Sequence, residues 1–217
     1  MKKLIAAAAA LVLAGGVFFA GDFYNGDIQL NLGVGFGNVK VGENKDSLTK
    51  STIADFGVES WHLFRPIDLL GVGFMVDLNG GIGGTRLDVD ALDVSGVALN
   101  FNFAIGPAVG VYLGTIVRLG ATFGFNAGFN VDDLKMESWD ENNGRPIHHL
   151  TTSYYSGYAG FIFGLQAKFF PNSKVNPVVG WKIVKGFSDT MNINDDSYDG
   201  DYDFTQNTLY IALSFNW

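Results

Sequence analysis

Acidic residues crowd the segment DDSYDGDYD near the C-terminus in the spacing that begins a calcium-binding loop. Counted along such a loop, Asp195, Asp199 and Asp203 take positions 1, 5 and 9, where oxygen ligands are expected. Position 12 is Gln206 rather than a bidentate glutamate, and no helices are indicated on either side. We therefore expect a solvated acidic surface segment, with these three aspartates as weak calcium candidates and no resident metal or cofactor.

A second set of charges lies inside stretches that otherwise alternate between apolar and small polar residues: Asp55, Glu59, Asp77, Arg118, Lys168 and Lys182. Successive residues of a β-strand point to opposite faces, so all six charges fall on the face opposite to the apolar residues. Buried charges are costly unless they are paired, and pairing would make this set a polar plug. Glycines on the same face leave room, so a narrow conduit lined by these charges is the alternative.

The sequence offers few residues suited to catalysis. Its histidines are His62, His148 and His149, and no Ser-His-Asp grouping stands out around them. Cysteine is absent, and the glycine clusters lack the helix and the Lys-Ser/Thr of a phosphate-binding loop. The formal net charge is −8 and no basic stripe is present. We therefore expect a protein that is not an enzyme and that has no nucleic-acid partner.

Eight segments alternate with a period of two, which predicts eight β-strands and no helix after the first twenty residues. The apolar faces of these segments cover residues 28–36, 54–58, 70–78, 97–105, 117–131, 159–169, 177–183 and 209–217. The opposite faces carry Gly, Asn, Ser, Thr and Ala, whereas a water-facing barrel wall would need Lys and Glu. The apolar face is therefore expected to face lipid, with a soluble ligand-binding barrel as the alternative.

A sheet immersed in lipid cannot leave an edge unpaired, so the strands must close into a barrel. The last strand is then expected to pair with the segment 28–36 near the start of the chain. Short connections (64–69, 108–115 and 170–175) alternate with long ones (39–51, 80–94, 132–150 and 187–204), and most charge lies in the long ones. This predicts an all-β, eight-stranded, antiparallel, up-and-down transmembrane β-barrel with both termini at the short-turn end.

Aromatic residues near the short-turn end look like the interfacial girdle of a membrane barrel. They are Tyr24, Trp61, Phe64, Tyr112, Phe169, Phe170 and Trp217, while Tyr154 and Tyr155 fall near the end of a long loop. His62 is expected on the lipid-facing side at the same boundary.

The first twenty residues have the pattern of a secretory signal peptide, with two early lysines, an apolar run and small residues. We expect a signal peptide over residues 1–20, cleaved after Gly16 or Ala20, and a barrel domain over residues 21–217. The absence of cysteine excludes disulfides and a lipoprotein anchor, so a closed hydrogen-bonded barrel is one remaining source of stability.

The chain ends in NTLYIALSFNW, an alternating strand with a terminal aromatic residue. Together with the signal peptide, the eight strands and the alternating loops, it resembles the small eight-stranded outer-membrane proteins of the OmpX/OmpW type over residues 22–217. The resemblance implies an outer-membrane location, with short turns in the periplasm and four long loops outside. It also implies that the last strand carries an assembly signal, formed by Leu209, Ile211, Leu213, Phe215 and Trp217. Trp217 departs from the usual terminal Phe.

The partners implied by the resemblance are outer-membrane lipid, the barrel assembly machinery and periplasmic chaperones, with a host or surface ligand for the loops. The leading functional hypothesis is a structural or adhesin-like role at the cell surface through acidic loops. The alternative is a porin-like, narrow passive channel for small or hydrophobic solutes, as in OmpW-type barrels.

Overall fold

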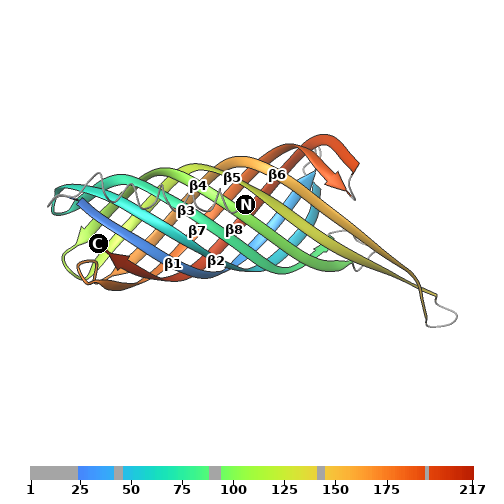
Figure 1. The fold of residues 1–217 in the computed structure, drawn as a ribbon, viewed down its shortest axis with the longest axis horizontal. Helices are drawn as coiled ribbons and strands as arrows, with labels where there is room; N and C mark the ends of the chain where they lie inside the picture. The colour runs from blue at the N-terminus through green and yellow to red at the C-terminus, as the bar shows by residue number, and fades with distance from the viewer. Residues whose placement is uncertain (1–23, 42–45, 88–93, 141–144, 194–195) are drawn as a thin grey trace.

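The computed structural model describes residues 24–41, 46–87, 94–140, 145–193 and 196–217, so the expected signal peptide lies outside the described residues. Eight strands follow one another (Figure 1): β1 (Tyr24–Val41), β2 (Asp46–Ile67), β3 (Leu70–Leu87), β4 (Ser95–Leu113), β5 (Val117–Asp140), β6 (Arg145–Phe169), β7 (Val175–Ile193) and β8 (Asp196–Asn216). Within the described ranges, no helix is long and apolar enough to span a membrane.

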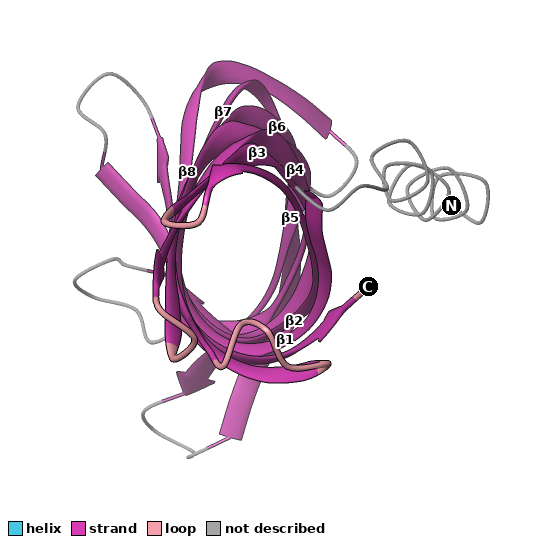
Figure 2. Cartoon of the chain, turned by 90° about the vertical axis from the view of Figure 1, so that its left-hand side faces the viewer, coloured by secondary structure: helices cyan, strands magenta, loops and turns pink. Residues whose placement is uncertain are grey.

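Each strand pairs antiparallel with the next, and β8 pairs with β1, which closes the ring seen in Figure 2. Ile28 faces Phe215 and Phe36 faces Asn207, so the expected pairing of the last strand with segment 28–36 is confirmed. Register partners traced once around the barrel from Asn25 lead back to Gly35, ten residues further along β1. Such a stagger tilts the strands by about 35–45°, and eight strands leave an interior that side chains can fill.

The outer face is apolar and exposed, whereas the inner face is polar and buried. On the outer face Phe125 is 69% exposed, Ile211 62% and Leu32 60%. Polar side chains such as Gln29 and Asn126 are buried inside. This distribution is the reverse of that in a soluble barrel, and it suits an outer wall in contact with hydrocarbon. The soluble ligand-binding alternative is therefore wrong.

The connections differ from expectation at one end of the barrel. The short turns are confirmed: residues 68–69, 114–116 and 170–174 link the strands at what we call the short-turn end. At the opposite, hairpin end, most of the expected long-loop residues belong to strands, and β5 and β6 extend as a ribbon to the pair Asp140–Arg145 (Figure 1). The prediction of four long loops is not confirmed, because many of these polar, charged residues continue hydrogen-bonded hairpins.

The fold places part of the calcium-like segment DDSYDGDYD on a strand rather than in a loop. Asp195 lies outside the described residues, and β8 runs from Asp196, so Asp199 and Asp203 are on an extended strand. The described residues contain no group of three His, Cys, Asp or Glu side chains that could hold a metal. The weak calcium assignment of Asp195, Asp199 and Asp203 stays a prediction, because Asp195 and the side chain of Asp199 lie outside what the structure describes.

Two aromatic residues assigned to the lipid girdle lie inside the barrel instead. Trp61 and Tyr112 are buried, and both alternate with the outward residues of their strands. The Tyr112 hydroxyl donates a hydrogen bond to Asn25 Oδ1 at 3.3 Å, and the Arg65 guanidinium lies 4.0 Å from the Tyr112 ring centroid. Phe64, Phe170 and Trp217 are exposed on the outside near the short turns. The girdle prediction is thus wrong for Trp61 and Tyr112, because nearness to a turn does not fix the face.

The closing register can be tested by a disulfide, since the natural chain has no cysteine. Leu32 and Ile211 are register partners on the outer face, so a Leu32→Cys/Ile211→Cys variant should cross-link on mild oxidation. The control is Leu32→Cys with Phe215→Cys, which lies about 13 Å out of register. Mobility on non-reducing gels after refolding measures the result. Equal cross-linking of both variants would contradict the register.

Candidate functional site: the polar lumen and the closing seam

The short-turn half of the lumen is organised around Asp27. Its Oδ2 accepts hydrogen bonds from Arg118 Nη1 at 2.7 Å and from Lys168 Nζ at 2.8 Å, and all three side chains are fully buried. Gln29 Nε2 donates to the other oxygen of Asp27 at 2.9 Å. Arg118 and Lys168 are register partners, so two like charges stand side by side on the wall. Such a pair is destabilising by itself, and the carboxylate of β1 reaching across the lumen neutralises it.

Lys182 holds a second group near the middle of the lumen. Its Nζ lies 3.2 Å from Asp77 Oδ2 and 3.9 Å from Asp55 Oδ1, and all three side chains are buried. Gln206 Nε2 donates to the other oxygen of Asp55 at 2.8 Å. One ammonium group therefore bridges carboxylates from β2 and β3, which would otherwise repel each other.

Glu59 lies between the two groups without a cation of its own among the described residues. It accepts hydrogen bonds from the Trp61 indole and, at 3.4 Å, from Asn31 Nδ2. Its register partner is Asp77, another acid. The described lumen buries five acidic residues (Asp27, Asp55, Glu59, Asp77 and Asp132) against three basic ones (Arg118, Lys168 and Lys182). The interior is therefore acidic overall, and it favours cations over anions.

Aromatic rings fill the room that the inward glycines leave. A Cβ added to Gly180 would overlap the Tyr210 ring, and one added to Gly120 would lie 2.9 Å from the Trp61 ring. Trp61, Leu63 and Met75 are all buried in the same half of the barrel. The glycines thus receive large neighbours, and buried side chains surround them in the short-turn half of the lumen.

Outside the barrel, Trp217 covers a small polar cluster at the seam, by which we mean the pairing of β1 with β8 that closes the barrel. His62 points outward, as expected from its register, but it is buried because its ring stacks on Phe74 with centroids 4.5 Å apart and lies near Trp217. The Tyr24 hydroxyl contacts His62 Nδ1, and Ser60 Oγ lies 2.9 Å from His62 Nε2. The main-chain N–H of Trp217 donates to the Gly26 carbonyl at 3.3 Å, and this contact extends the β1–β8 pairing to the last residue.

A serine–histidine contact is one element of a nucleophilic site, but its surroundings here are structural. Ser60 is fully buried, so no substrate reaches its hydroxyl, and it donates to the Asp27 carbonyl at 3.2 Å. The second nitrogen of His62 faces the Tyr24 hydroxyl rather than a carboxylate. The cluster links β1, β2 and the C-terminus across the seam.

The six lumen residues singled out from the sequence are all brought inside the barrel, in two groups, with Glu59 between the groups. Sequence reasoning missed Asp27, which joins Arg118 to Lys168, because the first strand was started at residue 28. It also missed Asp132, which was assigned to a loop although it is buried on the inner face of β5. Continuing the strict alternation by one residue at each strand end would have placed both inward.

These features define the class of protein: a closed eight-stranded β-barrel with a lipid-facing outer wall and a filled, charged lumen. No protein-family model matches the chain, and none of the curated proteins compared with it does.

Several solved structures of outer-membrane proteins are similar to it. Ail of Yersinia pestis, in complex with the heparin analogue sucrose octasulfate, is 15% identical over 88% of this chain and 99% of that one, with a TM-score of 0.44. The outer membrane protease OmpT from Escherichia coli is 10% identical over 92% and 98%, with a TM-score of 0.49. OprG from Pseudomonas aeruginosa is 11% identical over 89% and 96%, with a TM-score of 0.47. At these identities the likeness concerns the fold alone.

Removing the carboxylate of Asp27 should destabilise the barrel strongly. Asp27→Asn leaves Arg118 and Lys168 buried side by side without their counter-ion, at a cost of about 3–5 kcal/mol in the free energy of unfolding. Urea unfolding of the refolded protein in micelles measures the loss. Asp68→Asn, in an exposed turn, is the control and should change stability by less than about 0.5 kcal/mol. Adding Lys168→Met to Asp27→Asn should restore part of the loss, and equal stability of Asp27→Asn and Asp68→Asn would contradict the account.

A methyl group at Gly26 should disturb the seam. The Cβ of Gly26→Ala would overlap the Trp217 indole nitrogen and lie 2.8 Å from the Tyr24 hydroxyl, so the terminal tryptophan must move. We expect a loss of about 1–3 kcal/mol and a smaller heat-modifiable, folded fraction after refolding. Gly84→Ala is the matched control, because its Cβ would meet nothing closer than 4.0 Å on the outer face of β3. An unchanged folded fraction for Gly26→Ala would show that the tryptophan is not held in place there.

Proposed function

We propose that this protein is an integral outer-membrane barrel with a structural or surface-interaction role, carried by the acidic segments at its hairpin end. The observation that carries the proposal is the lumen: Asp27, Arg118 and Lys168 are fully buried and paired where an open pore would need free space. A barrel filled in this way acts as a rigid membrane anchor. Its functional surface is then the part that extends beyond the membrane.

The hairpin end has the features of a surface-facing region. The β5–β6 ribbon extends far past the neighbouring strands (Figure 1). In the sequence, the stretch between β3 and β4 includes Asp88, Asp90 and Asp93, which lie outside the described residues. With the short turns in the periplasm, this end faces the outside of the cell. The partners in this proposal are outer-membrane lipid, a host or surface ligand at the ribbon, and the barrel assembly machinery and periplasmic chaperones during export. The alternating strand that ends in Trp217 would be the assembly signal.

A second candidate is a narrow passive channel, and two observations favour it. The β6–β7 ladder is interrupted between Tyr155 and Ala159, so the wall is least continuous near the hairpin end. Buried polar atoms in the described lumen lack a hydrogen-bond partner, among them both side-chain atoms of Asn79 and the Asn102 amide nitrogen. These groups could bind a small solute as it passes.

Conductance in a planar bilayer separates the two candidates. Under the lead proposal, in which buried side chains fill the short-turn half of the lumen, the refolded mature chain gives no discrete channel openings at any voltage that the bilayer tolerates. An open porin refolded by the same protocol is the positive control. Reproducible single-channel steps would refute the plug and favour the narrow channel.

The surface role is tested by shortening the ribbon. Lys135 and Thr151 are register partners, so replacing residues 136–150 by Asn-Gly gives a two-residue hairpin at the same register. The heat-modifiable folded form should persist, while attachment of producing cells to host cells should fall to the level of cells that lack the protein. A ribbon of the same length with its acidic residues changed to Asn or Gln tests charge alone. Undiminished attachment by the shortened form would argue against the proposal.

A further inference from the structure

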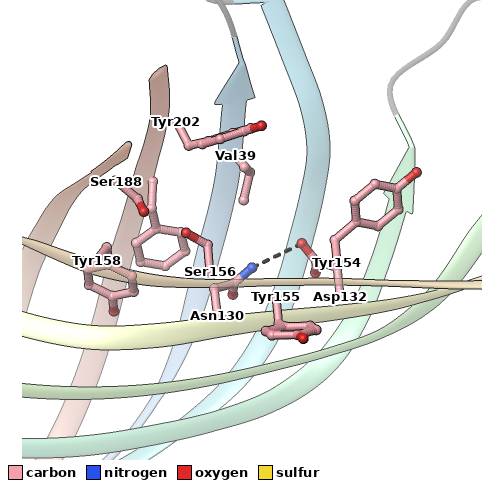
Figure 3. A pocket seen from close by; sticks show the side chains of 10 residues that line it. Val39, Asn130, Asp132, Tyr154, Tyr155, Ser156, Tyr158, Ser188 and Tyr202 are labelled. Atoms are coloured by element: carbon pink, nitrogen blue, oxygen red, sulfur yellow. Dashed lines mark hydrogen bonds between the residues drawn. The ribbon is translucent and has the colours of Figure 1, made fainter. Parts of the chain in front are cut away.

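The lumen contains a cavity at the hairpin end that none of the roles above uses. It measures about 20 Å³ and is lined by ten residues, five of them aromatic (Figure 3). Tyr154, Tyr158, Tyr202 and Phe204 lie on the inner face, whereas Tyr155, the register partner of Val131, is 37% exposed on the outer face. The rings of Tyr158 and Phe204 stack with centroids 4.7 Å apart and form a floor between the cavity and the deeper lumen. This part of the barrel is therefore a small cup with aromatic walls.

A buried carboxylate shares the cup with these rings. Asp132 is 2% exposed, and its Oδ2 accepts hydrogen bonds from Thr49 Oγ1 at 2.8 Å and from Asn130 Nδ2 at 3.0 Å, the second of which is drawn in Figure 3. Its Oδ1 is buried and has no hydrogen-bond partner among the described residues. Among the residues that the structure describes, none of those lining the cavity is Lys, Arg or His. The carboxylate is therefore held by neutral donors, with the Thr85 hydroxyl as a further neighbour, and the described part of the cavity wall holds no counter-charge.

A buried carboxylate without a counter-charge is unfavourable, so this site gains most from a cation. Aromatic faces attract organic cations through their quadrupole, and they provide poor ligands for Ca²⁺ or Mg²⁺, which require several oxygen atoms. The described residues contain no group of three acidic, His or Cys side chains for a metal. A carboxylate combined with aromatic walls is thus suited to an ammonium group.

The size of the cavity restricts the kind of ammonium group. A water molecule needs at least about 10–15 Å³ of such space, and a terminal –NH3⁺ is similar in size. A trimethylammonium head is much larger than the cavity. The alkyl chain of a primary amine can leave past Ser156 and Ser188, which line the rim where the β6–β7 ladder is interrupted. The net charge of −8 attracts cations to the molecule from a distance.

We propose that the cup at the hairpin end is a binding site for primary alkylammonium groups, with Asp132 as the counter-ion and the surrounding Tyr and Phe rings as the walls. Lysine side chains and polyamines share this chemistry. The site depends on the barrel alone, so the test of this site is independent of the test of the structural or adhesive role proposed above.

Titration of the refolded mature chain in micelles with n-butylammonium tests the proposal, with two-dimensional NMR as the readout. We expect saturable shifts confined to residues around 130–132, 154–158 and 202–204. Neutral 1-butanol, which has the same chain, should bind at least about tenfold more weakly because it lacks the charge. Spermidine and Nα-acetyl-lysine amide then show whether a polyamine or a lysine side chain is the better source of the group.

Variants locate the site. Asp132→Asn keeps the shape and should weaken n-butylammonium binding at least about tenfold. Asp133→Asn is the matched control, because Asp133 lies next in the chain on the outer face, where its Oδ1 accepts a hydrogen bond from Ser153 Oγ at 3.1 Å. It should bind as the natural chain does. Tyr202→Leu removes one wall and should also weaken binding, which provides a second variant if Asp132→Asn folds poorly.

Three outcomes would overturn the proposal. Equal affinity of the natural chain for 1-butanol and n-butylammonium would show that the cup binds the alkyl chain and not the ammonium group. Unchanged affinity of the folded Asp132→Asn variant for n-butylammonium would show that Asp132 is not the counter-ion. Binding of tetramethylammonium as tight as that of n-butylammonium would contradict the assignment to a primary ammonium group.

Discussion

The pairing of β1 with β8 is the interaction on which the rest of the structure depends. Hydrocarbon offers no hydrogen-bond partner, so a strand edge left open within the bilayer would cost several kcal/mol for each unpaired group. The ladder from Asp27–Asn216 to Val41–Tyr202 removes that edge. Once the ring is closed with eight strands and a stagger of ten residues, the interior has a fixed, narrow width. Everything inside the barrel must then fit that width.

The narrow interior explains why charge and aromatic bulk coexist in it. With the apolar side chains committed to lipid, the polar face must pack against itself, and its charges must find partners across the lumen. Asp27 is the partner of Arg118 and Lys168, and Lys182 is the partner of Asp55 and Asp77. Inward glycines such as Gly120 and Gly180 complement the rings of Trp61 and Tyr210. The folded state is thus held inside by hydrogen bonds and ion pairs, where a soluble domain has an apolar core.

The sequence predicts the local part of this architecture well and the non-local part poorly. Alternation is a property of neighbouring residues, so the faces of all eight strands follow from it directly. The closing partner of β8 is the one non-local pairing that could be predicted, because a sheet in lipid leaves no edge unpaired. The network around Asp27 could not, because Lys168 is 141 positions away and meets it only through the stagger of the barrel. Trp61 and Tyr112 point inward, as the alternation of their strands requires, because closeness to a turn does not determine the face of a residue. The expected long loops are not confirmed, because charge marks contact with water, and a hairpin continued beyond the bilayer contacts water as a loop does.

The seam at Trp217 also determines when the chain can fold. The first strand finds its second neighbour only in the last residues, so the defining contact has nearly the largest sequence separation that the chain allows. Contacts of this kind form late and slowly. A nascent or truncated chain would carry two unpaired edges, each able to pair with a foreign strand. Synthesis of β8 is therefore itself a checkpoint: until this strand is present, the barrel has an open edge that must be shielded from the membrane and from other chains.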